Sequence, residues 1–172
     1  STPGAGFLAD VCVRWEAAAL KAAPAGARVV LARLGVVLGP GGGALPRMAL
    51  PFKLFGGGPV GDGRQWLPWV HLDDAVGALI HLARTPAAKG AFNVVSPEAA
   101  RNADVSRALG RALGRPCWLA VPAFGLRLAL GELAEMLLGG QRVEPAVALE
   151  RGYRFQFPEL GPALSQLLRR AR

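Results

Sequence analysis

Several features are scarce or absent in this chain of 172 residues, and each absence argues against a class of protein. The two cysteines, Cys12 and Cys117, lie far apart and outside any Cys-x-x-Cys spacing, which argues against a disulfide framework and a cysteine metal site. No apolar run reaches the roughly 18 residues that a membrane-spanning helix needs. The first residues also lack the charged-then-apolar layout of a secretory signal. We therefore expect an intracellular, most simply cytoplasmic, protein with no metal and no membrane partner.

Lysine is scarce although the chain is basic. Lys and Arg number 20 against 12 Asp and Glu, a formal net charge of +8, but only three of the basic residues are lysines. A nucleic-acid-binding surface would gain affinity from clustered cations that release phosphate counterions, and this affinity would collapse as salt rises. The densest arginine group, Arg101, Arg107, Arg111 and Arg115, has no interleaved aromatic residues. We interpret it as a solvated helix face and expect no nucleic-acid partner.

Phosphate-binding glycine motifs are also absent, although the chain has 23 glycines. The stretch RLGVVLGPGGGALPRM, residues 33–48, leads an apolar run into four glycines. A P-loop needs Gly-x-x-x-x-Gly-Lys-Ser/Thr, and a dinucleotide-binding loop needs Gly-x-Gly-x-x-Gly at the start of a helix. Neither spacing occurs here, so this stretch by itself indicates a flexible loop after a buried strand.

The residues that are present favour one folded α/β domain. The composition is 52% hydrophobic and 19% charged, which argues against disorder. Residues 28–38 are β-branched and almost continuously apolar, as in a strand covered on both faces, so we expect a parallel sheet. Further strands are expected at 66–72, 91–95, 117–122 and 152–157, and helices at 7–23, 45–55 with an interruption at Pro51, 74–84, from Asn102 or Asp104 to Gly114, 124–138 and 160–168.

Four stretches of the chain, taken together, carry a recognisable pattern. They are RLGVVLGPGGG, GDGRQWLPWVHLDDAVGAL, AFNVVSPE and the tail VPAFGLRLALGELAEMLLGGQRVEPAVALERGYRFQFPEL. The pattern resembles the C-terminal part of the atypical, epimerase-like extended short-chain dehydrogenases/reductases. This resemblance implies an α/β fold, the C-terminal part of an NAD(P)-binding Rossmann-like doubly wound sheet with a small C-terminal helical substrate lobe. We accordingly expect residues 1–118 to belong to the Rossmann-like domain and residues 119–172 to form a family-specific C-terminal region.

The resemblance also implies a function. The full-length protein would bind NADP or NAD and act as an oxidoreductase or epimerase on a small-molecule substrate, as a homodimer. In this family the glycine fingerprint that holds the cofactor pyrophosphate would precede residue 1 of this chain, so we expect the N-terminal cofactor-binding half to be missing here. An organelle location stays open for the same reason.

The resemblance implies that the end of the apolar strand contacts the cofactor. Gly35, Val36 and Val37 would contact the nicotinamide end of the cofactor, and the loop 39–43 would face the substrate. Ligands of open α/β sheets bind at the carboxyl ends of strands, which agrees with this placement. Without the resemblance, the two valines are simply core residues.

The resemblance implies that the stretch after the second glycine loop, residues 56–63, contacts the substrate. Arg64 and Trp66 would contact the substrate in a cleft shared with the loop 39–43. The planar guanidinium of Arg64 would recognise a phosphate or a carboxylate bidentately. The alternative for Arg64 is a surface or loop-bracing arginine.

The catalytic tyrosine and lysine of the superfamily have no counterpart in this chain. In Tyr-x-x-x-Lys, the tyrosine acts as general acid/base and the lysine lowers its pKa. Glu16 resembles the glutamate that follows that lysine by four residues, which places Leu8 at the tyrosine position and Cys12 at the lysine position. The only tyrosine is Tyr153. Because an isobutyl group and a thiol cannot perform this proton transfer, we assign no catalytic residue. A non-catalytic dinucleotide-sensing or interaction protein is therefore the alternative function.

The other chemistry-bearing side chains are expected to be structural. Cys12 has apolar neighbours, so we expect a buried, unreactive thiol. We expect His71 to be a structural histidine, and Asp73 and Asp74 to cap the helix that follows. Glu16 is expected to form a structural ion pair or hydrogen bond and not to act as a base.

Overall fold

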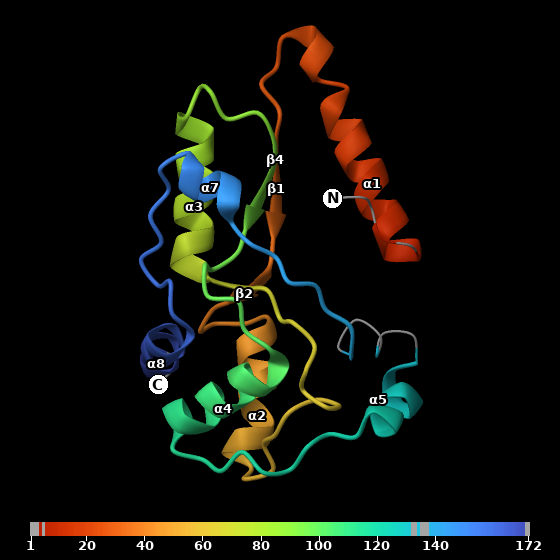
Figure 1. Ribbon diagram of the computed structural model, residues 1–172, viewed down its shortest axis with the longest axis vertical. Coiled ribbons are helices and arrows are strands. Elements are labelled where there is room, and N and C mark those ends of the chain that lie inside the picture. Colours follow the sequence, from red (N-terminus) through yellow and green to blue (C-terminus); the bar gives the residue numbers. More distant parts are fainter. Residues whose placement is uncertain (1–3, 5, 132–133, 135–137, 171–172) are drawn as a thin grey trace.

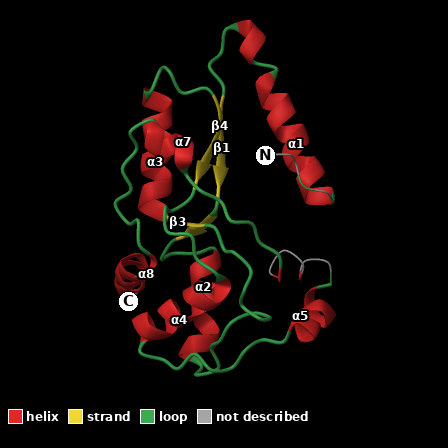
Figure 2. Ribbon diagram, viewed as in Figure 1, coloured by secondary structure: helices red, strands yellow, loops and turns green. Residues whose placement is uncertain are grey.

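The computed structural model describes residues 4, 6–131, 134 and 138–170 of the chain. Helices and short strands alternate along it, as in an α/β fold (Figures 1 and 2). The elements are α1 (Phe7–Leu20), η1 (Ala23–Ala25), β1 (Val30–Leu34), β2 (Val36–Leu38), α2 (Ala44–Lys53), β3 (Trp69–His71), α3 (Leu72–Arg84), β4 (Gly90–Val94), α4 (Asn102–Leu113), α5 (Ala123–Leu130), α7 (Ala146–Glu150) and α8 (Leu160–Arg170). No helix in these described residues is long and apolar enough to cross a bilayer.

The strands of the described residues form two parallel pairs that meet at Gly35. β1 pairs with β4, and β2 pairs with β3, which confirms the parallel α/β class. The single strand expected over 28–38 is wrong, because the chain changes partner in its middle. The Gly35 N–H donates to the carbonyl of Val94, whereas the Val36 N–H donates to the carbonyl of Pro68. The registers are Val30↔Gly90 through Leu34↔Val94 and Val36↔Trp69 through Leu38↔His71.

Close packing requires a glycine at position 35. A Cβ atom built on Gly35 would lie 2.7 Å from the carbonyl oxygen of Pro68 and 2.9 Å from Cγ1 of Val95. The absent side chain lets the segment before β3 approach the junction of β1 and β2, where the N–H···O distance from Val36 to Pro68 is 2.7 Å. Gly35 therefore has a structural role that needs no ligand.

The two sides of the β1–β4 pair are covered unequally. α3 and α7 lie on one side, and α1 stands on the other (Figure 1). No residue of α1 is buried, and β1 is half-buried at its start and exposed at Arg33 and Leu34. The expectation of a strand covered on both faces is therefore wrong for the part of the chain that the structure describes.

Two segments expected to be strands lack a regular ladder. Residues 117–122 bond to a stretch of glycines and a proline, and only an isolated bridge, Val60↔Val121, forms there. Proline has no N–H to donate, so a continuous ladder cannot form on this partner. In the segment 152–157, the backbone N–H groups of Gln156 and Phe157 donate to the carboxylate of Asp74 instead of to a neighbouring strand.

The core consists of two clusters, and both include residues from the C-terminal third of the chain. The first joins Leu38, Leu45, Phe52, Trp69, Ala100, Val105, Ala108 and Leu109 to Leu160, Ala163, Leu164 and Leu167 of α8. The second joins β4 and α3 to Ala148 and Tyr153. Each cluster therefore contains apolar side chains from both sides of the expected boundary at residues 118 and 119. The two-region division itself stays a prediction.

We expect Gly35→Ala to lower the free energy of unfolding by about 1–3 kcal/mol, because the added methyl group overpacks the contact with Pro68 and Val95. Gly41→Ala is the matched control, since a Cβ atom there meets nothing within 4 Å. Urea unfolding of both variants measures these changes. Equal unfolding midpoints for the two variants would contradict the close-packing role of Gly35.

Candidate functional site

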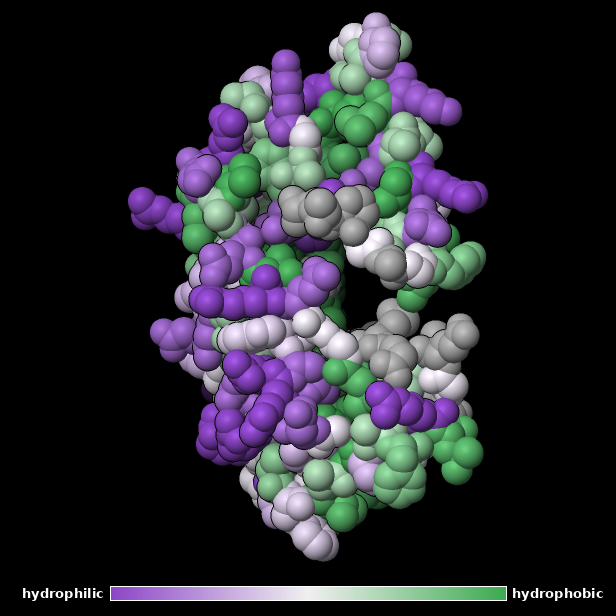
Figure 3. Space-filling view, turned by 45° about the vertical axis from the view of Figure 1, so that its right-hand side comes forward, coloured by the Kyte–Doolittle hydropathy of each residue, from purple (hydrophilic) through white to green (hydrophobic). Residues whose placement is uncertain are grey.

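A hollow of about 670 Å³ lies between α1 and the exposed side of β1. The space-filling view is open on this side of the molecule (Figure 3). Trp15, which lines the hollow, is 72% exposed, and Phe7 at the start of α1 is 80% exposed. The lining residues are Gly4, Ala9, Cys12, Val13, Trp15, Glu16, Ala19, Val30, Leu31, Ala32, Arg33, Leu34 and Gln141. The hollow thus reaches the carboxyl end of β1, where α/β folds bind ligands.

An ion pair between Glu16 and Arg33 joins α1 to β1 across this hollow. The Glu16 carboxylate accepts hydrogen bonds from Nε and Nη2 of Arg33, each at 2.7 Å. The hydrogen bonds from Arg33 lower the pKa of Glu16, and the same pair raises the pKa of Arg33. A carboxylate held ionised in this way is a poor general base near neutral pH. The expectation of a structural ion pair for Glu16 is confirmed.

Cys12 is exposed on the wall of the hollow, so the expectation of a buried thiol is wrong. Its apolar neighbours suggested burial, but they belong to a helix that buries none of its residues. Leu8, at the position implied for the catalytic tyrosine, is 48% exposed. Among the described residues, no group of three or more His, Cys, Asp or Glu side chains could hold a metal ion. Among the described residues that line the hollow, none is a tyrosine or a lysine.

The cofactor-facing candidates Gly35, Val36 and Val37 lie at the junction of β1 and β2. Val36 packs against the cluster that contains Trp69, and Val37 packs against the cluster that contains Tyr153. These are the core roles that the two valines have without the family resemblance. Their contact with a nicotinamide ring stays a prediction.

Arg64 and Trp66 lie before the amino end of β3, whereas the loop 39–43 follows the carboxyl end of β2. Because β2 and β3 are parallel, the two segments lie at opposite ends of this strand pair. The prediction that Arg64, Trp66 and the loop 39–43 share a cleft is therefore wrong. Arg64 is exposed, and its carbonyl oxygen accepts a hydrogen bond from Arg101. Substrate contacts of Arg64 and Trp66 stay predictions.

Trp66 is instead covered by two arginines from other parts of the chain. The guanidinium carbon of Arg101 lies 4.6 Å from the ring centroid, and that of Arg142 lies 5.6 Å away. Both distances are within cation–π range. A Cβ atom on Gly140 would clash with the Trp66 carbonyl. The backbone at position 140 can therefore approach Trp66 only because this residue is a glycine. Sequence reasoning missed both arginines because no local pattern signals contacts over such separations.

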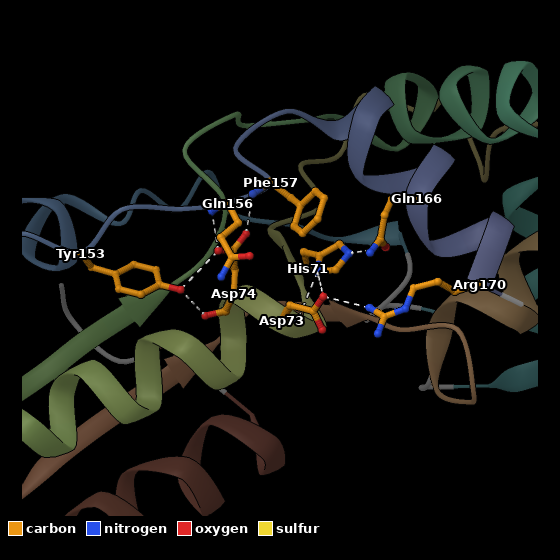
Figure 4. Close-up of polar contacts among 8 residues, drawn as sticks. All are labelled: His71, Asp73, Asp74, Tyr153, Gln156, Phe157, Gln166 and Arg170. Atoms are coloured by element: carbon orange, nitrogen blue, oxygen red, sulfur yellow. Dashed lines mark hydrogen bonds and ion pairs between the residues drawn. The ribbon is translucent and has the colours of Figure 1, made fainter.

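A buried histidine joins β3, α3 and α8 (Figure 4). Nδ1 of His71 accepts the N–H of Asp73 at 3.0 Å, and Nε2 lies 3.1 Å from Oε1 of Gln166. Because Nδ1 is an acceptor, the ring proton belongs on Nε2, which donates to Gln166. The ring also stacks on Phe157 with a centroid distance of 3.9 Å. The structural role expected for His71 is confirmed, but His71 caps α3 in place of the expected Asp73 and Asp74.

Asp74 uses its carboxylate to hold the segment that precedes α8 (Figure 4). This side chain is fully buried and accepts the N–H groups of Gln156 and Phe157 at 2.7 and 2.8 Å. The Tyr153 hydroxyl donates to the backbone carbonyl of Asp74 at 2.8 Å and lies 3.2 Å from its carboxylate. Burial, followed by the negative charge of Asp74, raises the pKa of Tyr153. The raised pKa of Tyr153 is opposite in direction to the lowered pKa that the general acid/base of the superfamily needs.

Two family models match separate parts of the chain. Residues 8–95 match the NAD dependent epimerase/dehydratase family, and residues 121–167 match a domain of unknown function, DUF1731. The first match covers half of the chain, and its range includes the hollow-lining residues of α1 and β1. The chain belongs to the NAD dependent epimerase/dehydratase family.

Individual relatives agree with this assignment. The epimerase family protein SDR39U1 of Bos taurus is 45% identical over 164 residues, which is 94% of this chain and 55% of the relative. The chloroplastic SDR39U1 homolog of Arabidopsis thaliana is 43% identical over 168 residues, 98% of this chain and 48% of the relative. The crystal structure of human SDR39U1 (isoform2) with NADPH is 40% identical with a TM-score of 0.89, covering 98% of this chain and 58% of that one. The chain thus spans about half the length of the curated relatives that it matches.

We expect Asp74→Ala to lower the free energy of unfolding by about 3 kcal/mol, because two backbone N–H groups lose the buried carboxylate that accepts their hydrogen bonds. Asp73→Ala is the control, since the partly exposed pair of Asp73 with Arg170 contributes less than about 1 kcal/mol. Urea unfolding gives the free energies, and limited proteolysis reports release of the segment 153–170. A similar loss in both variants would contradict the anchoring role of Asp74.

Tyr153 should also make stability depend on alkaline pH. Its pKa is raised in the folded state above the ordinary value near 10. The folded state therefore binds more protons than the unfolded state above that pH, so the free energy of unfolding falls as pH rises beyond about 10. Tyrosinate absorbance of the single tyrosine should rise only on unfolding or well above pH 10. Normal titration near pH 10 in folded protein, or an unchanged pH dependence in Tyr153→Phe, would show the tyrosine to be solvated.

Proposed function

We propose that the intact polypeptide containing this chain binds NADP or NAD and acts as an oxidoreductase or epimerase of the extended short-chain dehydrogenase/reductase type. The observation that carries the proposal is the similarity, over 98% of the chain, to human SDR39U1, whose structure was determined with NADPH. The open hollow at the carboxyl end of β1 supports it, because α/β folds bind dinucleotides at that end of the sheet. Gly35, Val36 and Val37 would contact the nicotinamide end.

The same proposal includes a small-molecule substrate near Arg64 and Trp66 and assembly as a homodimer. Exposed apolar residues on α1, such as Trp15, support the homodimer, because a second copy of the protein would cover them. An intracellular location, in the cytoplasm or in an organelle, is part of the proposal. The name of the Arabidopsis thaliana relative places that protein in the chloroplast.

A dinucleotide-sensing protein without catalysis is the second candidate. One observation favours it: the described residues around the hollow offer no group suited to the proton transfer, since Cys12 and Leu8 stand where the resemblance implies lysine and tyrosine. Tyr153 lies elsewhere, bonded to Asp74. Such a protein would keep the fold and the cofactor and lack turnover.

We expect the intact polypeptide to bind NADPH saturably, and residues 1–172 alone to show no saturable binding. The chain has no glycine motif for the pyrophosphate, and contacts at Gly35 to Val37 must overcome roughly 4 kcal/mol or more of lost translational and rotational freedom. Titration of NADPH fluorescence measures both proteins. Saturable micromolar binding by residues 1–172 alone would overturn the assignment of these residues to only one end of the cofactor.

Turnover separates the enzyme from the sensor. Purified intact polypeptide is incubated with NADPH and a panel of carbonyl compounds, and with NADP and the matching alcohols, while the absorbance of reduced nicotinamide is followed. Cofactor turnover supports the enzyme, and tight binding without turnover supports the sensor. Absence of any dinucleotide binding by the intact polypeptide would reject both.

A further inference from the structure

The indole of Trp66 is not available as a stacking platform. Arg101 and Arg142 already lie over its ring, at 4.6 and 5.6 Å from the centroid. A nucleobase or a sugar that stacked on Trp66 would have to displace a guanidinium group and lose its cation–π attraction, roughly 0.5–1 kcal/mol at an exposed site.

The space beside the ring is also too small for such a group. The groove bordered by Trp66, Trp69, Ala99, Gln141 and Val143 encloses about 10 Å³. This volume holds about one water molecule. A ligand can therefore reach this place only from the solvent side, where the two guanidinium groups lie.

The site presents N–H donors to that solvent. Both arginine side chains are exposed, and each guanidinium has five N–H donors. Arg101 uses one group on a backbone carbonyl at 3.1 Å, and Arg142 uses one on the carboxylate of Glu144 at 3.0 Å. The nearby carboxylate of Glu98 is engaged by a backbone N–H at the start of α8. Among the described residues, no carboxylate pairs with the Arg101 guanidinium.

The position of these arginines connects them with the proposed cofactor side. Gln141 lines both the groove beside Trp66 and the hollow at the carboxyl end of β1. Ala99 and Arg101 follow the carboxyl end of β4, which pairs with β1. A group bound by the two guanidinium forks would therefore lie next to the end of the sheet where ligands of α/β folds bind.

We propose that Arg101 and Arg142, held over Trp66, bind a carboxylate or phosphate group of a small substrate that carries no nucleobase. Planar guanidinium groups bind such anions bidentately, and a base that stacked on Trp66 would have to displace them from the ring. The anion site itself does not depend on the proposed function. Only the statement that the bound anion belongs to a substrate rests on it.

Anion binding to the intact polypeptide is measured calorimetrically, without any nicotinamide, using malonate, inorganic phosphate and UDP at constant ionic strength. We expect malonate or phosphate to bind, and the tighter of the two identifies the substrate group. Arg101→Gln and Arg142→Gln should each weaken that binding about tenfold or more, as expected for a lost charge-assisted hydrogen bond. Arg101→Lys, which keeps the charge and loses the fork, should give a smaller loss. Arg107→Gln is the matched control, an exposed arginine on α4 paired with Asp104.

Three outcomes would overturn the proposal: no binding of malonate or phosphate, an equal loss in Arg107→Gln, or UDP binding that is tighter than both anions and depends on Arg101. Urea unfolding checks that each variant is folded. If Arg101→Gln is not folded, Arg101→Lys still tests whether anion binding depends on the guanidinium fork. NADPH titration of the same proteins is independent of these results. A protein that binds the anion and no NADPH would reject the proposed function and leave the anion site standing.

Discussion

The arrangement of the segment 153–170 depends on the hydrogen bonds that the Asp74 carboxylate accepts. A buried and unpaired carboxylate would cost several kcal/mol, so the fold must supply donors to it. The donors come from residues about eighty positions later, at Gln156 and Phe157, and this brings the chain back to the start of α3. His71 acts in parallel through Gln166 on α8. The polar contacts of His71 and Asp74 thus fix where α8 lies, and the apolar side of α8 then completes the core.

Local patterns were sufficient for most of the elements. The periodicity of α1, α3, α4 and α8 placed these helices within a few residues of their bounds, and the apolar run at 28–38 indicated a parallel sheet. The errors occurred where a distant residue decides the local structure. Gly35 divides the run because Pro68 and Val95 leave no room for a side chain. The segment 152–157 is not a strand because its N–H groups are used by Asp74.

The candidate site was less predictable than the fold, for the same reason. Trp66 stood out in the sequence, but the arginines over its ring come from segments that only the folded chain brings there. Cys12 illustrates the opposite error: apolar neighbours indicate burial only if a partner surface covers the helix, and within the described residues α1 has none. The family resemblance supplied the expectation of a dinucleotide, which no motif of these 172 residues indicates. The family model covers the residues of α1 and β1 that line the hollow.

The place of α8 in the core has a consequence for synthesis on the ribosome. α2, β3 and α4 emerge first, and their apolar side chains, such as Phe52 and Leu109, have no complete interior until Leu164 and Leu167 follow. At about 5–20 residues per second, this delay is on the order of seconds. Throughout that interval the nascent chain exposes an apolar surface that chaperones bind. Completion of the interior therefore waits for α8, and a chain whose synthesis stops before α8 keeps this apolar surface exposed.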